Sequence, residues 1–237
     1  MREEKREVAK RPDICLSLCC ATMEEFEIES QDYKEHCQLV EWNVDKMIGS
    51  AKYEKEEFIE KLKQVKKLCQ GKKLIVNYAG SEIVGNRIRR WAMGHTDIID
   101  IDINNSQIKK LIREAKIKRT KTLISQHISG KMVDKNEVAT QFVKMEKTGG
   151  NILCIECFAN SEEEGHHILQ GASAYTQLKR NKPIIAIAMG EEGQASRICA
   201  GDFGSILTYC CGSKPDAPGQ INAKDMNKYL DIYYERR

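Results

Sequence analysis

The chain has 237 residues, and 41% of them are hydrophobic, which is enough to bury the core of one domain. Lysine and arginine number 38, and aspartate and glutamate number 35, so the formal net charge at pH 7 is only +3. This near balance excludes the strongly basic face that nucleic acids or anionic membranes require. We therefore expect a small-molecule ligand as partner, and neither a nucleic acid nor a membrane.

No segment has the pattern of a membrane span or a secretory signal. Apolar runs stay below the roughly 18 residues that a span needs, and residues 1–13 are charged without an apolar stretch. Two pairs of adjacent cysteines, Cys19 with Cys20 and Cys210 with Cys211, lie inside apolar runs, as is typical of buried free thiols. Such thiols suit a reducing compartment, so we expect a cytoplasmic protein.

Short apolar runs alternate with segments of helical period along the whole chain, which is the pattern of a parallel sheet with crossover helices. The clearest helical segments are 56–69, 161–180 and 222–234. The strand-like runs, in chain order, are 14–20, 39–44, 73–79, 97–103, 121–128, 151–158, 183–189 and 204–210.

Eight strands in alternation with helices predict an α/β fold of the (β/α)8 TIM barrel type, as a single domain over residues 1–237. Residues 1–12 are expected to form a ragged N-terminal tail. A doubly wound sheet is the structural alternative, but no GxGxxG sequence follows any of the predicted strands.

In such a barrel, polar side chains at the carboxyl ends of the strands form the active-site mouth. This rule selects candidates from five strands and from two later loops. They are Glu41, Asn43, Asp100, Asp102, Gln126, His127, Cys154, Glu156, Met189, Arg197 and the segment 216–220.

Two of these candidates carry the clearest chemistry. An imidazole at a strand end, such as that of His127, is suited to general acid or base catalysis near neutral pH, although a buried core histidine is the alternative. Arg197 offers a forked cation for a carboxylate or phosphate, or else an ion pair with Asp202 or Asp216.

Cys154 and Cys157 have the spacing of a zinc knuckle, but on a strand residues three apart point to opposite faces. No second CxxC completes a zinc site, and no nucleotide-binding loop is present in the sequence. We therefore expect no metal and no obligatory cofactor.

The ordered motifs VEWNVD, TDIIDIDI, ISQHIS, PIIAIAM, SRICAGDFGS and DAPGQ resemble the type I 3-dehydroquinate dehydratase family along almost the whole chain. The resemblance implies an α/β barrel that converts 3-dehydroquinate to 3-dehydroshikimate in the shikimate pathway of aromatic amino acid biosynthesis. The family uses a Schiff-base lysine on strand six and a proton-transferring histidine on strand five. Family members are commonly dimers, so the resemblance adds a homodimer to the expectations.

Five residues match functional positions of the family. Glu41 matches an acid of the family's strand-two motif, Asp102 matches an acid that is usually Glu, and His127 matches the proton-transferring histidine. Arg197 matches the carboxylate-binding arginine, and Gln220 matches the glutamine of the substrate loop. These matches imply a retained pocket.

Other positions depart from the family. Cys154 stands where the Schiff-base lysine is expected, Asn43 and Ala79 stand where the family has arginines, and Asp216 stands where it has serine. These changes remove about four units of positive charge from the predicted pocket, so an anionic substrate should bind poorly.

A further departure concerns the segment that follows strand three. Ile83 aligns with a glutamate of the family, although a slip of one residue would place Glu82 there.

The leading hypothesis is a diverged member of the family that has lost the Schiff-base dehydration, because a cysteine cannot form an imine. It would bind or transform a related, less anionic polar molecule. A second hypothesis makes Cys154 a nucleophile or acid beside His127, and a third keeps dehydratase activity without the lysine, with His127 as general acid and base. The candidate catalytic residues are His127, Cys154 and Glu41, and the candidate substrate-binding residues are Arg197, Gln220, Asp216, Asn43, Asp102 and Met189.

Overall fold

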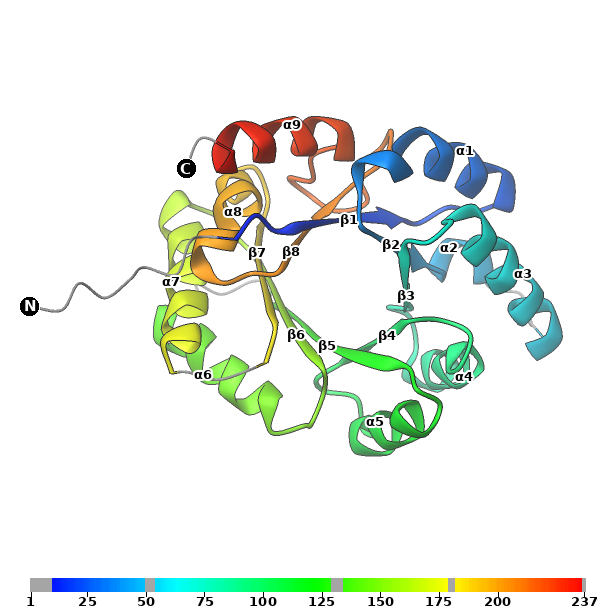
Figure 1. Cartoon of the computed structure of the whole chain (residues 1–237). Helices are drawn as coiled ribbons and strands as arrows, with labels where there is room; N and C mark the ends of the chain where they lie inside the picture. Colours follow the sequence, from blue (N-terminus) through cyan, green and yellow to red (C-terminus); the bar gives the residue numbers. More distant parts are fainter. Residues whose placement is uncertain (1–9, 50–53, 129–133, 179–181, 236–237) are drawn as a thin grey trace, which may run out of the picture.

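The computed structural model describes residues 10–49, 54–128, 134–178 and 182–235. Eight parallel strands form a nearly closed barrel with the helices around it, as expected for a (β/α)8 fold (Figure 1). The strands pair in the order β7-β6-β5-β4-β3-β2-β1-β8, and a parallel bridge between Ile184 and Ser205 joins the two edges. The strands are β1 (Asp13–Leu18), β2 (Leu39–Asn43), β3 (Lys73–Asn77), β4 (Ile98–Asp102), β5 (Lys121–Ile128), β6 (Ile152–Phe158), β7 (Ile184–Met189) and β8 (Leu207–Cys210).

The helices lie outside the ring of strands (Figure 1). Side chains of Thr22, Asp134, Ser161 and Asn222 accept hydrogen bonds from backbone N–H groups in the first turns of four of them, which fixes where these helices begin. The helices are α1 (Met23–Tyr33), η1 (Lys34–His36), α2 (Asp45–Ile48), α3 (Lys55–Leu68), α4 (Glu82–Ala92), α5 (Ile108–Ile117), α6 (Lys135–Glu146), α7 (Glu162–Gln177), α8 (Gln194–Cys199), η2 (Ala200–Phe203) and α9 (Ala223–Tyr234). Within the described ranges, none of them combines the length and the hydropathy that crossing a membrane requires.

All eight predicted strands are present, and most ends agree within two residues. The largest difference is at β8, which begins at Leu207 rather than at Gly204. Gly204 has φ +93 and ends η2, so the chain cannot enter the extended conformation there. The predicted run 204–210 therefore starts three residues before β8.

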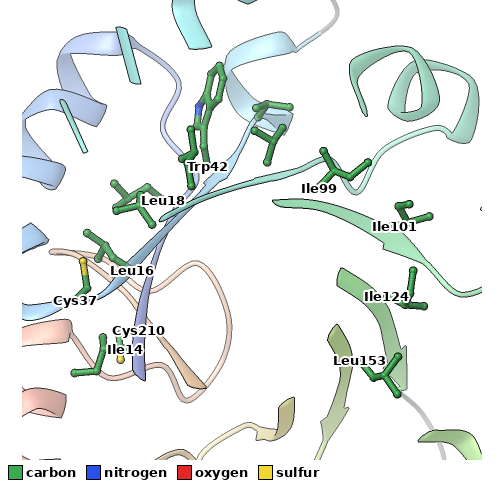
Figure 2. Packing of buried hydrophobic residues seen from close by; sticks show 14 of the residues in the cluster. Ile14, Leu16, Leu18, Cys37, Trp42, Ile99, Ile101, Ile124, Leu153 and Cys210 are labelled. Carbon is green, nitrogen blue, oxygen red and sulfur yellow. The ribbon is translucent and has the colours of Figure 1, made fainter. Parts of the chain in front are cut away.

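The outer face of the strands packs against the helices and forms the larger hydrophobic core. Leu16, Trp42, Ile101, Ile124 and Leu153 belong to it (Figure 2). The indole of Trp42 stacks on the ring of Phe58 from α3 at 5.6 Å between centroids. This packing fixes the strands against their helices and so holds the strand ends in place.

The inner face of the strands forms a second, smaller apolar cluster inside the barrel, and β6 shows the alternation clearly. Ile152 and Cys154 belong to the inner cluster, whereas Leu153, Ile155 and Cys157 belong to the outer core. Cys154 and Cys157 therefore point to opposite faces, as predicted, and all ten cysteines are free thiols.

Candidate active site

A cavity of about 460 Å³ opens at the carboxyl ends of the strands, where barrel enzymes place their active sites. Its walls come from the ends of the strands, from the start of α4 and from the loop after β8. Seven of the nine candidate residues line it: Glu41, Asn43, Asp102, His127, Met189, Asp216 and Gln220. Cys154 and Arg197 do not.

Three carboxyl groups lie together on the floor of the cavity, on β2, β4 and β6. Glu41 accepts a 2.9 Å hydrogen bond from the Ser17 hydroxyl, and Asp100 accepts one of 2.6 Å from the Ser125 hydroxyl. Burial, with repulsion from Asp100 and Glu156, raises the pKa of Glu41 to about 8. Burial also raises the pKa of Asp100 to about 6, against the lowering effect of Ser125. Glu41 and Asp100 therefore keep their protons to a higher pH than ordinary carboxyl groups do.

His127 stands next to this floor. It pairs in register with Glu156 on the neighbouring strand, and its Nε2 lies 3.6 Å from a Glu156 carboxylate oxygen. The His127 side chain is 53% exposed, so it is not a buried core histidine. Its place at the open end of the cavity suits proton exchange between solvent and a bound molecule.

Cys154 lies beneath the cavity, fully buried in the inner apolar cluster. Its Sγ is 3.7 Å from a Glu156 carboxylate oxygen. Burial and the nearby carboxyl groups of Glu156, Asp100 and Glu41 raise the pKa of this thiol well above its usual range. A nucleophilic cysteine needs the opposite surroundings, a cation that favours the thiolate, so this geometry argues against the hypothesis of a reactive Cys154.

Arg197 is almost fully buried behind β8 rather than exposed in the cavity. Its Nη1 donates to the Tyr209 carbonyl and its Nη2 to the Pro218 carbonyl, each at 3.2 Å. Neither Asp202 nor Asp216, its expected alternative partners, forms an ion pair with it. Arg197 therefore holds the loop after β8 against that strand.

The loop 216–220 forms one wall of the cavity. The Gln220 side-chain oxygen accepts hydrogen bonds from the N–H groups of Asp216 and Ala217 at 2.8 and 3.2 Å, and Asp216 accepts one of 3.0 Å from Cys19 N–H. Gly219 has φ +73, and a Cβ there would collide with the carbonyl of Gly190. Only glycine fits this close approach without strain.

The prediction of the site missed Arg89, a cation of α4 that lines the cavity. The guanidinium is almost fully buried, and its Nη2 donates to the Tyr78 carbonyl at 2.9 Å while its Nε donates to the Asp100 carbonyl. Gly85, one turn earlier, leaves room for it, because a Cβ there would meet Nη1 of Arg89. No local sequence pattern indicates this role of Arg89, because the helices of a barrel normally cover its outside.

Ser17, Asn77, Ser125 and Tyr209 also line the cavity, and here a signal was present. Each lies two residues after an apolar residue of the inner cluster, namely after Cys15, Ile75, Leu123 and Leu207. Side chains two apart on a strand share a face, so period-two alternation would have found all four.

Glu82, not Ile83, lines the cavity. Its carboxylate accepts hydrogen bonds from Ser106, including one of 3.2 Å from the backbone N–H. The Ile83 side chain is 86% exposed. Of these two neighbouring residues, it is therefore Glu82 that faces the cavity.

Comparisons with known proteins agree on one family. The family model described as type I 3-dehydroquinase matches residues 14–237. The 3-dehydroquinate dehydratase of Clostridioides difficile strain 630 is 24% identical over 239 residues, which cover 95% of this chain and 93% of that protein. The 3-dehydroquinate dehydratase of Clostridium botulinum strain Eklund 17B is 28% identical over 238 residues, with coverage of 94% and 93%.

Solved structures show the same fold. A type I 3-dehydroquinate dehydratase from Clostridium difficile, with covalently modified comenic acid, superposes with a TM-score of 0.87 at 22% identity and covers 97% of this chain and 96% of that one. A 3-hexulose-6-phosphate synthase superposes with a TM-score of 0.63 at 12% identity and covers 92% and 99%. Both proteins thus share the barrel fold, and the TM-score is higher for the dehydratase.

Proposed function

This chain belongs to the type I 3-dehydroquinase family, and from that premise we propose that it does not carry out the Schiff-base dehydration of 3-dehydroquinate. Instead, its cavity binds or transforms a related polar molecule that is less anionic. The observation that carries the proposal is Cys154, which lies on β6 at the position where the motif resemblance implies the family's lysine.

The missing amine matters because an imine withdraws the electrons that the removal of a substrate proton leaves behind. A thiol cannot form an imine. Among the described residues that line the cavity there is no lysine, so none of them supplies a replacement.

Lysines near the barrel lie in other places. Lys182 donates a 2.7 Å hydrogen bond to the Gly150 carbonyl, at the amino ends of the strands and thus far from the cavity. Lys46 on α2 lies at the rim, with its Nζ 3.8 Å from Asp216 and its side chain 60% exposed. Lys131 falls outside the described residues, so it enters the experiment as a variant.

Charge supports the same proposal. The described lining contains six carboxyl groups, from Glu41, Glu82, Asp100, Asp102, Glu156 and Asp216. Its basic side chains, Arg89 and His127, are fewer, and Arg89 already donates to two carbonyls. A carboxylate substrate would therefore meet like charges inside a cleft.

The proposal is tested by borohydride reduction with 3-dehydroquinate, followed by intact-mass measurement and peptide mapping. The Clostridioides difficile relative is run in parallel as a comparison. We expect no adduct on wild type or on Lys131→Ala, whereas an adduct on any lysine of wild type refutes the proposal. If an adduct forms, its loss in Lys131→Ala or Lys46→Ala identifies the amine.

One observation favours a second function, a lyase that works without the lysine. His127 lies at the open end of the cavity with its Nε2 3.6 Å from a Glu156 carboxylate oxygen, where an imidazole can exchange a proton with a bound substrate. In that case wild type would produce the conjugated enone from 3-dehydroquinate, and His127→Ala would abolish it. Enone formation no faster than in buffer excludes this second candidate.

A further inference from the structure

Among the described residues, no lysine or arginine lies within ion-pair distance of the carboxyl groups on the cavity floor, although the charge of Arg89 lowers the pKa of Asp100. Within the described part of the chain, neither Glu41 nor Asp100 forms an ion pair with lysine or arginine, and Glu156 has only the 3.6 Å contact with His127. Asp100 and Glu156 both raise the pKa of Glu41, and Glu156 raises that of Asp100, so the three groups lie close enough to repel one another. A cation placed among them would replace repulsion with attraction.

The arginines nearest the floor are held away from this role. Arg89 directs Nε and Nη2 to backbone carbonyls of Asp100 and Tyr78, and Arg197 directs its two terminal nitrogens to carbonyls of Tyr209 and Pro218. Their N–H groups serve the backbone rather than the carboxylates. Neither arginine therefore donates a hydrogen bond to the carboxyl group of Glu41 or of Glu156.

A second observation, independent of the carboxyl groups, is the hydroxyl of Tyr209. Tyr209 lies on the inner face of β8, lines the cavity and is only 4% exposed. Its hydroxyl forms no hydrogen bond with any of the described residues. The side chain is thus more than nine-tenths buried while its hydroxyl stays open to the cavity, where it can hydrogen-bond a bound molecule.

The upper wall offers amides for further polar groups. The side chain of Asn77 and the amide nitrogens of Asn43 and Gln220 donate to no described residue, although the Asn43 and Gln220 oxygens accept from backbone N–H groups. Free amide donors at the mouth suit the hydroxyl groups of a ligand.

We propose that this cavity binds a small organic cation, an amine on a hydroxylated ring, with the ammonium group between Glu41 and Glu156. Tyr209 then hydrogen-bonds the ring substituent next to the amine, and the amides at the mouth bind its hydroxyl groups. The proposal rests on the proposed function because it names the ligand class of the same cavity.

The test compares three probes that share one ring and differ in charge: 4-aminocyclohexanol, cyclohexane-1,4-diol and 4-hydroxycyclohexanecarboxylate. Dissociation constants are measured at pH 7 by ligand-observed NMR and calorimetry on the full chain. One charge-assisted hydrogen bond corresponds to about a tenfold change in affinity, so the amine is expected to bind at least about tenfold more tightly than the diol. The carboxylate should bind most weakly. Equal binding of amine and diol, preference for the carboxylate, or no binding of the amine overturns the proposal.

Substitutions of the two glutamates test where the ammonium group binds. Glu41→Gln and Glu156→Gln keep shape and volume, and each should lower the affinity for the amine about tenfold while leaving that for the diol unchanged. Glu60→Gln is the matched control, because Glu60 is exposed on α3 and its carboxylate pairs with Lys63 away from the cavity. Tyr209→Phe should weaken the amine and the diol alike. If the Glu41 and Glu156 variants bind the amine as wild type does, the assigned position is wrong.

The two proposals fail separately. A borohydride adduct with 3-dehydroquinate refutes the loss of Schiff-base chemistry whatever the amine does. Lack of preference for the amine, in a chain that forms no adduct, refutes only the ligand class.

Discussion

The side chains on the inner face of the barrel form two layers on the same strands. The lower layer is the apolar inner cluster, and the upper layer is the polar lining of the cavity. On β2 and β4 the lower layer holds Leu39 and Ile98, whereas two residues further along it is Glu41 and Asp100 that face inward. The backbone geometry of both layers is the same. The lower layer stabilises the barrel because its apolar side chains are buried. The upper layer lowers stability because its buried carboxyl groups have no lysine or arginine ion-pair partner among the described residues. Groups retained at such a cost indicate a function in binding.

The largest effect is expected from breaking the lower layer. Leu123→Ala removes a fully buried side chain from the inner cluster and should lower the free energy of unfolding by about 2–5 kcal/mol. Denaturant unfolding measures it. Ile117→Ala, at an isoleucine that is 73% exposed on α5, is the control and should change stability by less than about 0.5 kcal/mol. Similar losses in both variants would contradict the role assigned to the layer.

A substitution in the upper layer should raise the stability of the chain rather than lower it. At pH 9, Glu41→Gln is expected to be more stable than wild type by roughly 1–3 kcal/mol, because it removes a buried charge. Three of the groups around Glu41 are carboxyl groups, those of Asp100, Glu156 and Asp216, and the others are Ser17, Tyr209, Cys15 and Cys154.

The pH dependence of this difference follows from the raised pKa of Glu41. The unfolded chain releases the proton near pH 4.5 and the folded chain near pH 8, so between these values the folded state holds more protons. Stability contributed by this group is therefore lost as the pH rises through that window. Wild type and Glu41→Gln should be equally stable at pH 4 and diverge towards pH 9. A difference that is constant with pH would show that ionisation of Glu41 is not its cause.

The smallest effect concerns the loop that covers the upper layer. Gly219→Ala should destabilise the chain by about 1 kcal/mol more than Gly149→Ala. Both glycines have positive φ, +73 and +89, but an added Cβ meets the Gly190 carbonyl only at Gly219 and has open space at Gly149. Thermal unfolding of the two variants measures this difference. The loss in Gly149→Ala reports the cost of the backbone conformation, and the additional loss in Gly219→Ala reports the collision with the Gly190 carbonyl. Equal effects would mean that the close approach is unimportant.

The two layers also differ in how well the sequence predicted them. The eight strands were predicted correctly because strands buried on both faces are continuous apolar runs. Nine candidate residues were predicted, most of them from their places at the carboxyl ends of strands, and seven of the nine line the cavity, including Glu41 and His127. Arg89 and Arg197 were missed or misplaced, because their positions depend on backbone carbonyls of other elements. Such contacts form only when the barrel closes, and no local pattern encodes them.

Intact-mass measurement after borohydride reduction with 3-dehydroquinate at pH 7 decides whether this cavity supplies a Schiff-base amine. We predict an unchanged mass for this chain under conditions in which the Clostridioides difficile relative is modified. An added mass of one reduced ligand on a lysine of this chain would contradict the proposed loss of Schiff-base chemistry.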